Sequence, residues 1–297
     1  GQIGGDEQVS LLCAAGMSEE KAKRELALAR RMLSREYLEE RVRRELVDTG
    51  EKEFVPSDGK EAVRQVRRPL GVLLHIAAGN ADALSVFSVI EGLLSENINI
   101  LKLPGGGDVF SEAILLELIR LEPRIADRVF VFDFPSSDRE ALERLAACAD
   151  AVVVWGGDAA VTEVRKRVKP DTAIIEWGHK IGFAYVSGKS ISDDALSGLA
   201  AHICDTNQLL CSSCQGIYVD TGSFDEVQAF AERFLGVLEA CAARDPLPND
   251  LLRSAQIGLE LYTEELESAE AQKAVFRGGN VAASAYGDSE LTVSYQY

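Results

Sequence analysis

The stretch from Gly71 to Ile76 reads GVLLHI, a short apolar run that is typical of a buried strand. A polar turn, AAGNAD at residues 77–82, follows it, and residues 83–95 then read as a helix. A strand, a turn and a helix in this order indicate the first part of an α/β fold.

The same pattern repeats up to residue 176. Further apolar segments predict strands, and the stretches between them predict helices of about a dozen residues. The predicted strands are 98–103, 129–132, 151–155 and 172–176, and the helices between them are 109–121, 138–147 and 159–167. Strands that alternate with helices predict a parallel, doubly wound α/β sheet with helices on both faces.

Polar residues and glycines directly follow several of these strands. They are Asn80, Lys102, Gly156, Gly157 and Glu176. In parallel sheets of this kind, ligands bind beyond the carboxyl ends of the strands. We therefore predict that these residues border one ligand cleft at that edge of the sheet.

A second informative stretch, NQLLCSSCQGIYV at residues 207–219, carries a polar, cysteine-bearing loop into an apolar segment. The apolar segment predicts a strand, which would hold the loop and present a thiol at the strand's edge. Thiolates attack carbonyls and thioesters to give covalent intermediates. The stretch therefore predicts that Cys211 is a nucleophile.

Three other interpretations of these cysteines remain open. A cysteine is most often a small buried hydrophobic residue. The C-x-x-C spacing also fits a redox pair, although such a motif normally opens a helix, and this one enters a strand. His202 and Cys204 lie just upstream and would allow a zinc site. Their spacing is tight and no second C-x-x-C exists, so we expect no metal.

The flanking segments predict the remaining organisation. Residues 17–50 have an amphipathic, strongly charged helical pattern. After the sheet we expect strands at 183–186 and 290–295 and helices at 193–204 and 224–240. The predicted parts are an N-terminal helical segment (1–58), a dinucleotide-binding domain (59–205) and an α/β catalytic domain (206–297).

The composition excludes several classes of protein. The chain has 297 residues, 46% of them hydrophobic, which is enough for one or two domains. Its net charge of −17 argues against nucleic acid as the main partner. Six cysteines without a disulfide framework, and no signal-like segment, indicate a reducing cytoplasm. No apolar run approaches the ~20 residues of a membrane span.

Five segments together resemble the aldehyde dehydrogenase superfamily, and most closely its LuxC-type acyl-CoA reductases. In chain order they are RPLGV through GN at residues 68–80, LK at 101–102, WGGD at 155–158, EWGHK at 176–180 and CSSCQ at 211–215. The resemblance covers roughly residues 60–220. The family's catalytic domain is longer than the part that follows Cys211 here, so we expect this domain to be incomplete.

The resemblance implies a role for each catalytic candidate. Cys211 would form the acyl-enzyme, whereas Cys214, from its spacing to Val219, would be a packing residue. Asn80 and the Cys211 backbone N–H would donate to the oxyanion, and such donors contribute about 3–4 kcal/mol each. A turn-capping role for Asn80 is the alternative. Glu176 would handle protons or be an ordinary strand-end carboxylate.

The resemblance also implies cofactor contacts. Lys102 would lie beside the adenosine ribose, or it would be a solvated lysine. NAD-preferring relatives commonly carry Glu three residues later, where this chain has Gly105. The missing carboxylate removes repulsion against a 2′-phosphate and favours NADP. Gly156 and Gly157 would let the backbone approach the cofactor at a helix N-terminus, or they would only form a turn.

These expectations together describe an NADP-dependent acyl-CoA reductase that acts through an acyl-cysteine. The enzymatic alternatives are a CoA-independent aldehyde dehydrogenase, in which Glu176 would activate water, and an acyl-phosphate reductase. A catalytically incomplete scaffold subunit is an alternative of another class. The family usually carries an oligomerisation arm, so a homo-oligomer is one expected state.

Overall fold

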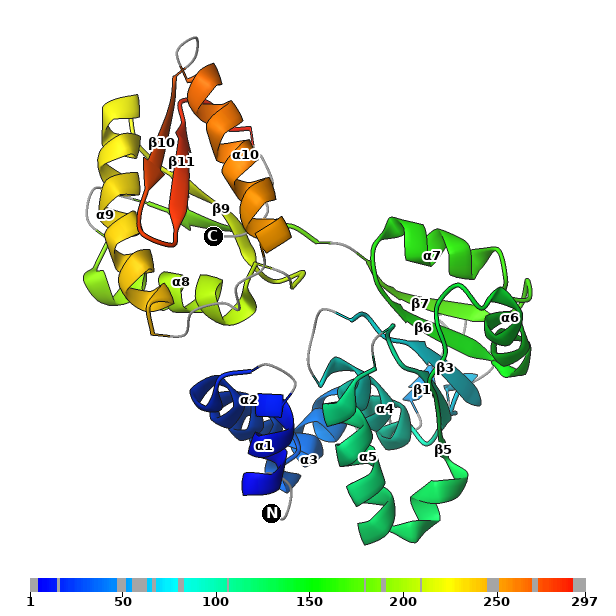
Figure 1. Ribbon diagram of the computed structural model, residues 1–297. Helices are drawn as coiled ribbons and strands as arrows, with labels where there is room; N and C mark the ends of the chain where they lie inside the picture. The colour runs from blue at the N-terminus through cyan, green and yellow to red at the C-terminus, as the bar shows by residue number, and fades with distance from the viewer. Residues whose placement is uncertain are drawn as a thin grey trace. The chain divides into compact units, whose positions relative to one another are not determined.

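The computed structural model divides the chain into two compact units, residues 1–179 and 180–297, which we describe separately (Figure 1). The structure describes residues 5–14, 17–46, 52–54, 63–65, 68–79, 83–105, 107–178, 180–187, 191–208, 210–244, 251–268 and 272–290.

Three helices open the first unit: α1 (Asp6–Ala14), α2 (Glu19–Met32) and α3 (Arg35–Glu45). The predicted helical segment 17–50 is broken at Ser34, whose side chain accepts a hydrogen bond from the Tyr37 N–H and caps α3. Such caps satisfy amide groups that a helix start leaves unpaired. The sequence analysis did not identify α1.

The centre of the first unit is a five-stranded parallel sheet in the order β5-β4-β3-β6-β7. The strands are β3 (Val72–Ile76), β4 (Ile98–Lys102), β5 (Val129–Phe132), β6 (Ala151–Trp155) and β7 (Ala173–Trp177). The chain order reverses between β3 and β6, so the sheet is doubly wound. The predicted fold class is confirmed.

Helices cover both faces of this sheet (Figure 1). On one face α4 (Leu84–Leu94) and α5 (Val109–Leu121) pack together with α1 and α2 in one apolar cluster. On the other face α6 (Arg139–Cys148) and α7 (Asp158–Arg165) pack against alternate residues of β3 and β6. A 3₁₀ helix, η2 (Pro123–Asp127), precedes β5, and β1 (Lys52–Phe54) and β2 (Val63–Gln65) pair with one another.

A buried polar network links the sheet to α4. The Trp155 Nε1–H donates to Ser88 Oγ (3.1 Å), Ser88 lies 2.7 Å from His75 Nδ1, and His75 Nε2 lies 3.0 Å from Asn99 Oδ1. The Asn99 amide nitrogen donates to the Asn97 carbonyl, so its Oδ1 must accept. His75 is therefore neutral, with the proton on Nε2. Burial lowers its pKa to about 4.

The second unit contains two small sheets. β8 (Gly182–Val186) and β9 (Cys214–Val219) pair in parallel, with α8 (Asp193–Thr206) between them in the chain. The antiparallel hairpin of β10 (Lys273–Arg277) and β11 (Ala282–Tyr286) lies between α9 (Phe224–Ala242) and α10 (Leu251–Glu267) (Figure 1). The sequence analysis missed α10 and the hairpin. The strand predicted at 290–295 lies outside the described residues, apart from Glu290, which is in no strand.

The boundary between the compact units differs from the predicted domain boundary at residue 205. β8 pairs with β9, and α8 packs on α9. Residues 180–205 therefore belong to the second compact unit, and the predicted dinucleotide-binding domain of residues 59–205 stays a prediction. No helix within the described part of the chain is long and apolar enough to cross a membrane.

The neutral His75 predicts a pH-dependent stability of the first unit. Its folded pKa lies below the ordinary value of 6.5, so its contribution is present above pH 6.5 and is lost as the pH falls towards 4. His75→Gln lacks this loss. The variant should be less stable than the unmodified protein at pH 7. The difference between their free energies of unfolding should be smaller by about 3 kcal/mol at pH 4.

Urea unfolding followed by tryptophan fluorescence measures this gap, because the protein's two tryptophans, Trp155 and Trp177, both lie in the first unit. A gap that stays constant between pH 7 and pH 4 would contradict the neutral, buried imidazole.

Candidate active site

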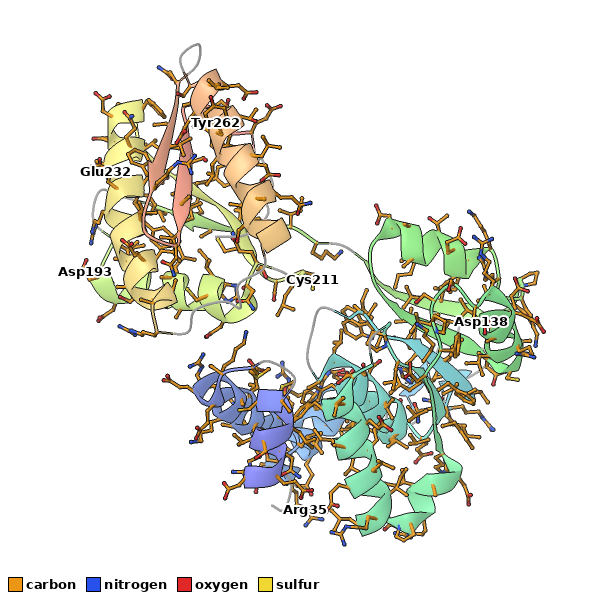
Figure 2. The ribbon with its side chains drawn as sticks, in the orientation of Figure 1. Arg35, Asp138, Asp193, Cys211, Glu232 and Tyr262 are labelled. Carbon is orange, nitrogen blue, oxygen red and sulfur yellow. The ribbon has the colours of Figure 1, made fainter. Side chains whose placement is uncertain are left out.

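Cys211 lies on the loop between α8 and β9 (Figure 2). The helix ends at Asn207, which has the left-handed conformation, and Gln208 keeps a positive φ of 51°. A turn follows in which the Ser213 N–H donates to the Leu210 carbonyl, 2.9 Å away. Cys211 and Ser212 are the two central residues of this turn, and the Cys211 side chain is exposed.

Side chains on both sides of the turn hold it in place. Ser213 is fully buried, and its Oγ accepts from the Leu210 N–H (2.9 Å). His202 Nε2 donates to the Ser212 carbonyl (3.0 Å). Gln208 donates to the Cys214 carbonyl (3.0 Å), and Gln215 donates back to the Gln208 carbonyl (2.6 Å). The exposed thiol is therefore carried by a backbone whose neighbours are fixed.

Cys214 differs from Cys211 in every respect that matters for reactivity. It is the first residue of β9, it is buried, and its Sγ donates to the Gly216 carbonyl (3.2 Å). Burial raises the pKa of the Cys214 thiol, so the nucleophilic thiolate is disfavoured there. The packing role predicted for Cys214 agrees with this environment.

The metal and redox interpretations gain no support from the geometry. Among the residues that the structure describes, no three His, Cys, Asp or Glu side chains gather as a metal site would require. His202 instead donates to the loop backbone. The cysteines of the C-x-x-C motif are both free thiols, one exposed and one buried.

Gly182 allows strand β8 to approach this loop. A Cβ atom at Gly182 would lie 2.4 Å from the Ser213 carbonyl oxygen, which is closer than any real contact. Gly182 pairs with Cys214, and a bulge between Gly182 and Phe183 shifts the register that follows. The absence of a side chain at residue 182 is therefore a condition for the observed position of the turn.

The cofactor candidates lie in the first unit, where Lys102 ends β4. Its side chain is 3% exposed, its Nζ donates to Ser136 Oγ (2.8 Å), and it lies 5.6 Å from the centre of the Phe134 ring. Burial lowers the pKa of Lys102, while the charge of Asp133 acts in the opposite direction. Lys102 is thus not the solvated lysine of the alternative interpretation.

The loops after β3 and β4 meet next to Lys102. A Cβ atom at Gly79 would lie 3.2 Å from Pro104 Cβ, whereas one at Gly105 would meet no atom within 4 Å. Gly105 is therefore exposed and would accept a side chain without a clash. Asn80 lies outside the described residues, and its predicted role in the oxyanion site stays a prediction.

Gly156 and Gly157 lead from β6 into α7. The Gly156 N–H donates to the Trp177 carbonyl (3.3 Å). Gly157 is the N-cap of α7 and offers no side chain to cap its amide groups. A helix start of this kind binds anions, because its free N–H groups and the helix dipole both favour negative charge. These glycines fit the predicted contact with a cofactor phosphate.

Glu176, near the end of β7, forms an ion pair with Arg165 of α7. The parallel register aligns Lys102, Ile76, Val154 and Glu176 across the sheet, with their side chains on the face that α6 and α7 cover. The pair with Arg165 agrees with the strand-end carboxylate that the sequence left as an alternative. A catalytic role for Glu176 stays a prediction.

The structure thus brings Lys102, Gly156, Gly157 and Glu176 to one edge of the first unit. Lys102 and Glu176 lie three strands apart, roughly 14 Å at the usual strand spacing, which is a distance for an extended ligand and not for two catalytic partners. Cys211 lies in the second unit.

The sequence analysis missed the Trp155–Trp177 stack at the same edge, with ring centres 4.9 Å apart and planes at 7°. A signal was present, since each tryptophan directly follows an apolar strand core.

Comparison with known proteins relates this arrangement to a family. The model of a family described as acyl-CoA reductase (LuxC) matches residues 7–280. A long-chain acyl-protein thioester reductase of Vibrio harveyi is 29% identical over 161 residues, which are 53% of this chain and 34% of that protein. One of Aliivibrio fischeri is 28% identical over 154 residues, 51% of this chain and 32% of that protein. The chain thus matches about a third of the length of these curated relatives.

Solved structures show the same fold. An NADP-dependent enzyme of E. coli has a TM-score of 0.67 at 19% identity, over 89% of this chain and 54% of that one. An NAD-dependent benzaldehyde dehydrogenase of Corynebacterium glutamicum has a TM-score of 0.66 at 18% identity, over 92% and 60%. The predicted aldehyde dehydrogenase-like fold is confirmed.

The close approach at Gly182 predicts a measurable effect on the loop. Gly182→Ala must push the Ser213 carbonyl away, which should destabilise the second unit by about 1–3 kcal/mol. Because Ser213 holds the turn, Cys214 should then be alkylated by iodoacetamide at least about tenfold faster, through easier local opening. Peptide mass spectrometry measures this rate.

Gly236→Ala is the matched control, since a Cβ there meets no atom within 4 Å. It should leave alkylation of Cys214 slow. Equal rates for the two variants would show that Gly182 does not hold the loop.

Proposed function

Because the chain belongs to the acyl-CoA reductase (LuxC) family, we propose that it reduces a long-chain acyl thioester to the aldehyde through an acyl-enzyme on Cys211. The sequence predicted acyl-CoA as the donor. The curated relatives are named for acyl-protein thioesters, so we propose a protein-bound thioester as the natural donor. Both donors present the same carbonyl carbon and thiol leaving group to Cys211.

The observation that carries this proposal is the state of the Cys211 thiol. It is exposed, while the turn that carries it is held by Ser213, His202 and Gln208. A nucleophile that is fixed in place and open to a substrate loses little freedom when it reacts. The buried Cys214 lacks this access.

The first step is transfer of the acyl group to Cys211. The Cys211 sulfur, as thiolate, forms a bond to the acyl carbonyl carbon, the bond from that carbon to the donor sulfur breaks, and the donor thiol leaves with the proton that Cys211 lost. Negative charge develops on the carbonyl oxygen. The Cys211 N–H makes no hydrogen bond to another described residue and is free to donate to this oxygen.

The second step is reduction of the acyl group. NADPH, held by Lys102, Gly105, Gly156 and Gly157, would supply a hydride, which would add to the acyl carbonyl carbon. The bond to the Cys211 sulfur then breaks, the aldehyde leaves, and the sulfur takes up a proton from solvent. Neither step needs an activated water molecule, which fits the ion pair between Glu176 and Arg165.

Three features of the first unit fit NADP. Lys102 is a cation at the edge where cofactors bind in doubly wound sheets. Gly105 leaves open space where a carboxylate would repel a 2′-phosphate. The start of α7 at Gly157 offers amide groups to the pyrophosphate. We assign these residues to the cofactor on that basis.

Substitution of the two cysteines tests the reaction. Cys211→Ala should abolish acylation by a tetradecanoyl thioester and lower the rate of aldehyde formation at least about a thousandfold, since covalent catalysis is lost. Cys214→Ala should retain both within a few-fold and cost about 1 kcal/mol of stability. Intact-mass spectrometry after incubation with tetradecanoyl-CoA or a tetradecanoyl-cysteinyl peptide measures acylation. NADPH consumption measures turnover.

Each outcome separates the interpretations. A redox pair would lose activity with either cysteine. Acylation of Cys214 would move the nucleophile by three residues. A chain that neither donor acylates, but that binds NADPH, would be the scaffold subunit.

Substitution at Gly105 tests the cofactor. Gly105→Glu places a carboxylate in the open space beside the loop after β4, so the Kd for NADPH should rise about tenfold, or 1.4 kcal/mol, and that for NADH should not. Quenching of Trp155 and Trp177, at the same edge, measures binding. Gly105→Gln, of equal size and no charge, should leave the Kd for NADPH within about twofold. Equal effects of Glu and Gln would exclude the electrostatic explanation.

A further inference from the structure

The second unit contains a cavity of about 1040 Å³. Its walls come from β9, α9, α10 and the hairpin strand β11, all within residues 180–297. The volume is at the upper end of the range of ~300–1000 Å³ for small-molecule sites. None of the residues that we assigned to the cofactor lines it.

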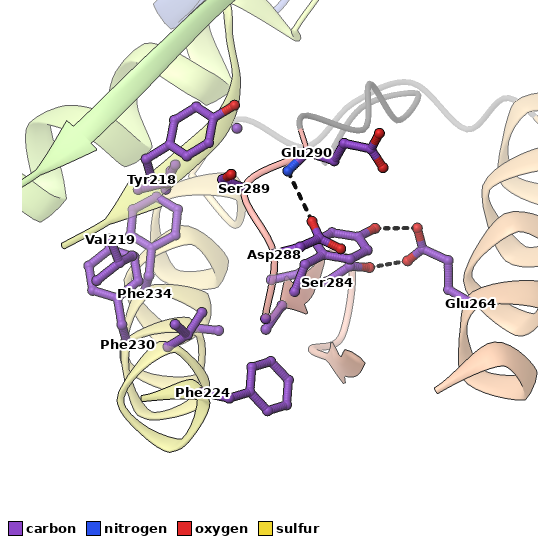
Figure 3. A pocket seen from close by; sticks show the side chains of 18 of the residues that line it. Tyr218, Val219, Phe224, Phe230, Phe234, Glu264, Ser284, Asp288, Ser289 and Glu290 are labelled. Carbon is purple, nitrogen blue, oxygen red and sulfur yellow. Dashed lines mark hydrogen bonds between the residues drawn. The ribbon is translucent and has the colours of Figure 1, made fainter. Parts of the chain in front are cut away.

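One wall is an apolar stripe of α9. Val227, Phe230, Phe234 and Leu238 recur at helical spacing and all line the cavity. Phe230 and Phe234 are stacked, with ring centres 6.0 Å apart. In Figure 3 they lie together with Phe224 on the side of the cavity opposite Glu264. Phe234 and Leu238 are 4% and 3% exposed, so the half-buried Val227 and Phe230 are the part of this stripe that can contact a hydrocarbon chain.

The facing wall is polar, but its main polar groups are satisfied by one another. Glu264 of α10 accepts hydrogen bonds from the Ser284 hydroxyl and from the Tyr286 hydroxyl, the latter at 2.5 Å (Figure 3). Burial, together with the hydrogen bond to Glu264, raises the pKa of Tyr286. These groups hold α10 to β11 and leave little hydrogen-bonding capacity for a ligand.

The charged side chains that line the cavity are acidic, and one cation, Lys273, lies 5.3 Å from the centre of the Tyr286 ring. Among the described residues that line it, the ionisable acidic side chains are Asp225, Glu260, Glu264, Asp288 and Glu290, and none is Lys, Arg or His. Carboxylates repel the phosphates of a dinucleotide or of CoA and the carboxylate of a free fatty acid. An uncharged chain is the ligand that suits an apolar wall in this field.

The cavity also reaches the nucleophile's loop. Gln208, Cys214 and Gln215 line it, and these are residues that hold the Cys211 turn from behind. Cys211 precedes Cys214 by three residues, and three residues of extended chain span at most about 11 Å. The Cα atom of Cys211 therefore lies within about 11 Å of the Cα atom of Cys214, which lines the cavity.

We infer that this cavity holds the hydrocarbon chain of the acyl group while its carbonyl carbon is bonded to Cys211. The inference rests on the proposed function, which it extends by assigning the residues that select chain length. The apolar stripe of α9 contacts the chain, and each buried methylene adds roughly fourfold in affinity. The carboxylates keep charged head groups out.

A pair of substitutions on α9 tests the assignment. Ala231 lines the cavity, and Ala229 is exposed on the same helix. The acylation rate of the full chain is measured by intact-mass spectrometry with N-acetylcysteamine thioesters of 4 to 16 carbons. Ala231→Leu should slow acylation by the 14-carbon thioester at least about tenfold and leave the 4-carbon rate unchanged. Ala229→Leu should change neither.

Ala283→Leu, from β11, repeats the test from another wall, so that misfolding of one variant does not decide the outcome. Equal effects on short and long chains, or no effect on the long chain, would overturn the assignment.

A binding measurement separates this assignment from the reaction itself. Methyl cis-parinarate, an uncharged fluorescent fatty ester, should bind the Cys211→Ala protein, and adding Ala231→Leu should weaken this binding at least about tenfold. Such binding without any acylation of Cys211 in the unmodified protein would remove the proposed function and leave the cavity as a binding site for a hydrocarbon chain alone. Acylation of Cys211 with binding that ignores Ala231→Leu would do the reverse. Displacement of the ester by micromolar spermine would show that the carboxylates make the cavity a site for cations. That result would also overturn the assignment.

Discussion

The pairing of β3 with neighbours on both sides is the constraint on which the first unit depends. β3 pairs in parallel with β4 through Val72–Ile76 and with β6 through Leu73–Ile76. Both crossovers then place their helices on opposite faces, and all strands end at the same edge. That edge therefore collects Lys102, Gly156 and Glu176. In the sequence, Lys102 lies 54 positions before Gly156 and 74 positions before Glu176. A different order would separate them.

The network behind this edge explains how the position of Trp155 is set. Its N–H reaches Ser88, and the chain of donors continues through His75 to Asn99. Trp155 can only donate and the Asn99 oxygen can only accept, so Ser88 and the neutral His75 between them each accept one hydrogen bond and donate one. Gly92 lets α4 lie close to this network, because a Cβ there would coincide with Asn99 Oδ1. Packing and hydrogen bonding thus fix the orientation of Trp155, which stacks on Trp177.

The sequence predicted the first unit better than the second for a physical reason. Strands buried on both faces are continuous apolar runs, as β3 and β6 are. The edge strands β5 and β7 are mostly exposed, but their sequences are also apolar enough to predict strands. The hairpin sequences KAVFR and AASAY are short and rich in Ala and charge, so their strand propensity is weak and they depend on packing against α9 and α10. The boundary near residue 180 depends on which strand pairs with β8, which local pattern does not encode.

The site shows the same division between local and distant information. The exposed position of Cys211 on a loop before a strand could be predicted, because the loop and the strand are contiguous in the sequence. The environment of that loop could not be, because Gly182 lies 29 residues before Cys211 in the chain and acts through its close approach to the Ser213 carbonyl. The ion pair of Glu176 with Arg165 and the hydrogen bond from Lys102 to Ser136 likewise join different segments of the chain. Side-chain partners follow from topology, which must be known first.

The two units differ in the charge that they offer to a ligand. The edge of the first unit offers Lys102, two glycines and a helix start, all of which favour phosphate. The cavity of the second unit has carboxylates and an apolar wall, which favour an uncharged chain. An enzyme that joins a polyanionic cofactor to a lipid-like acyl group must keep each ligand out of the other's site, because hydrophobic contact alone distinguishes them poorly. Under the proposed function the carboxylates of the cavity would supply that repulsion, so specificity would depend on an unfavourable interaction as well as a favourable one.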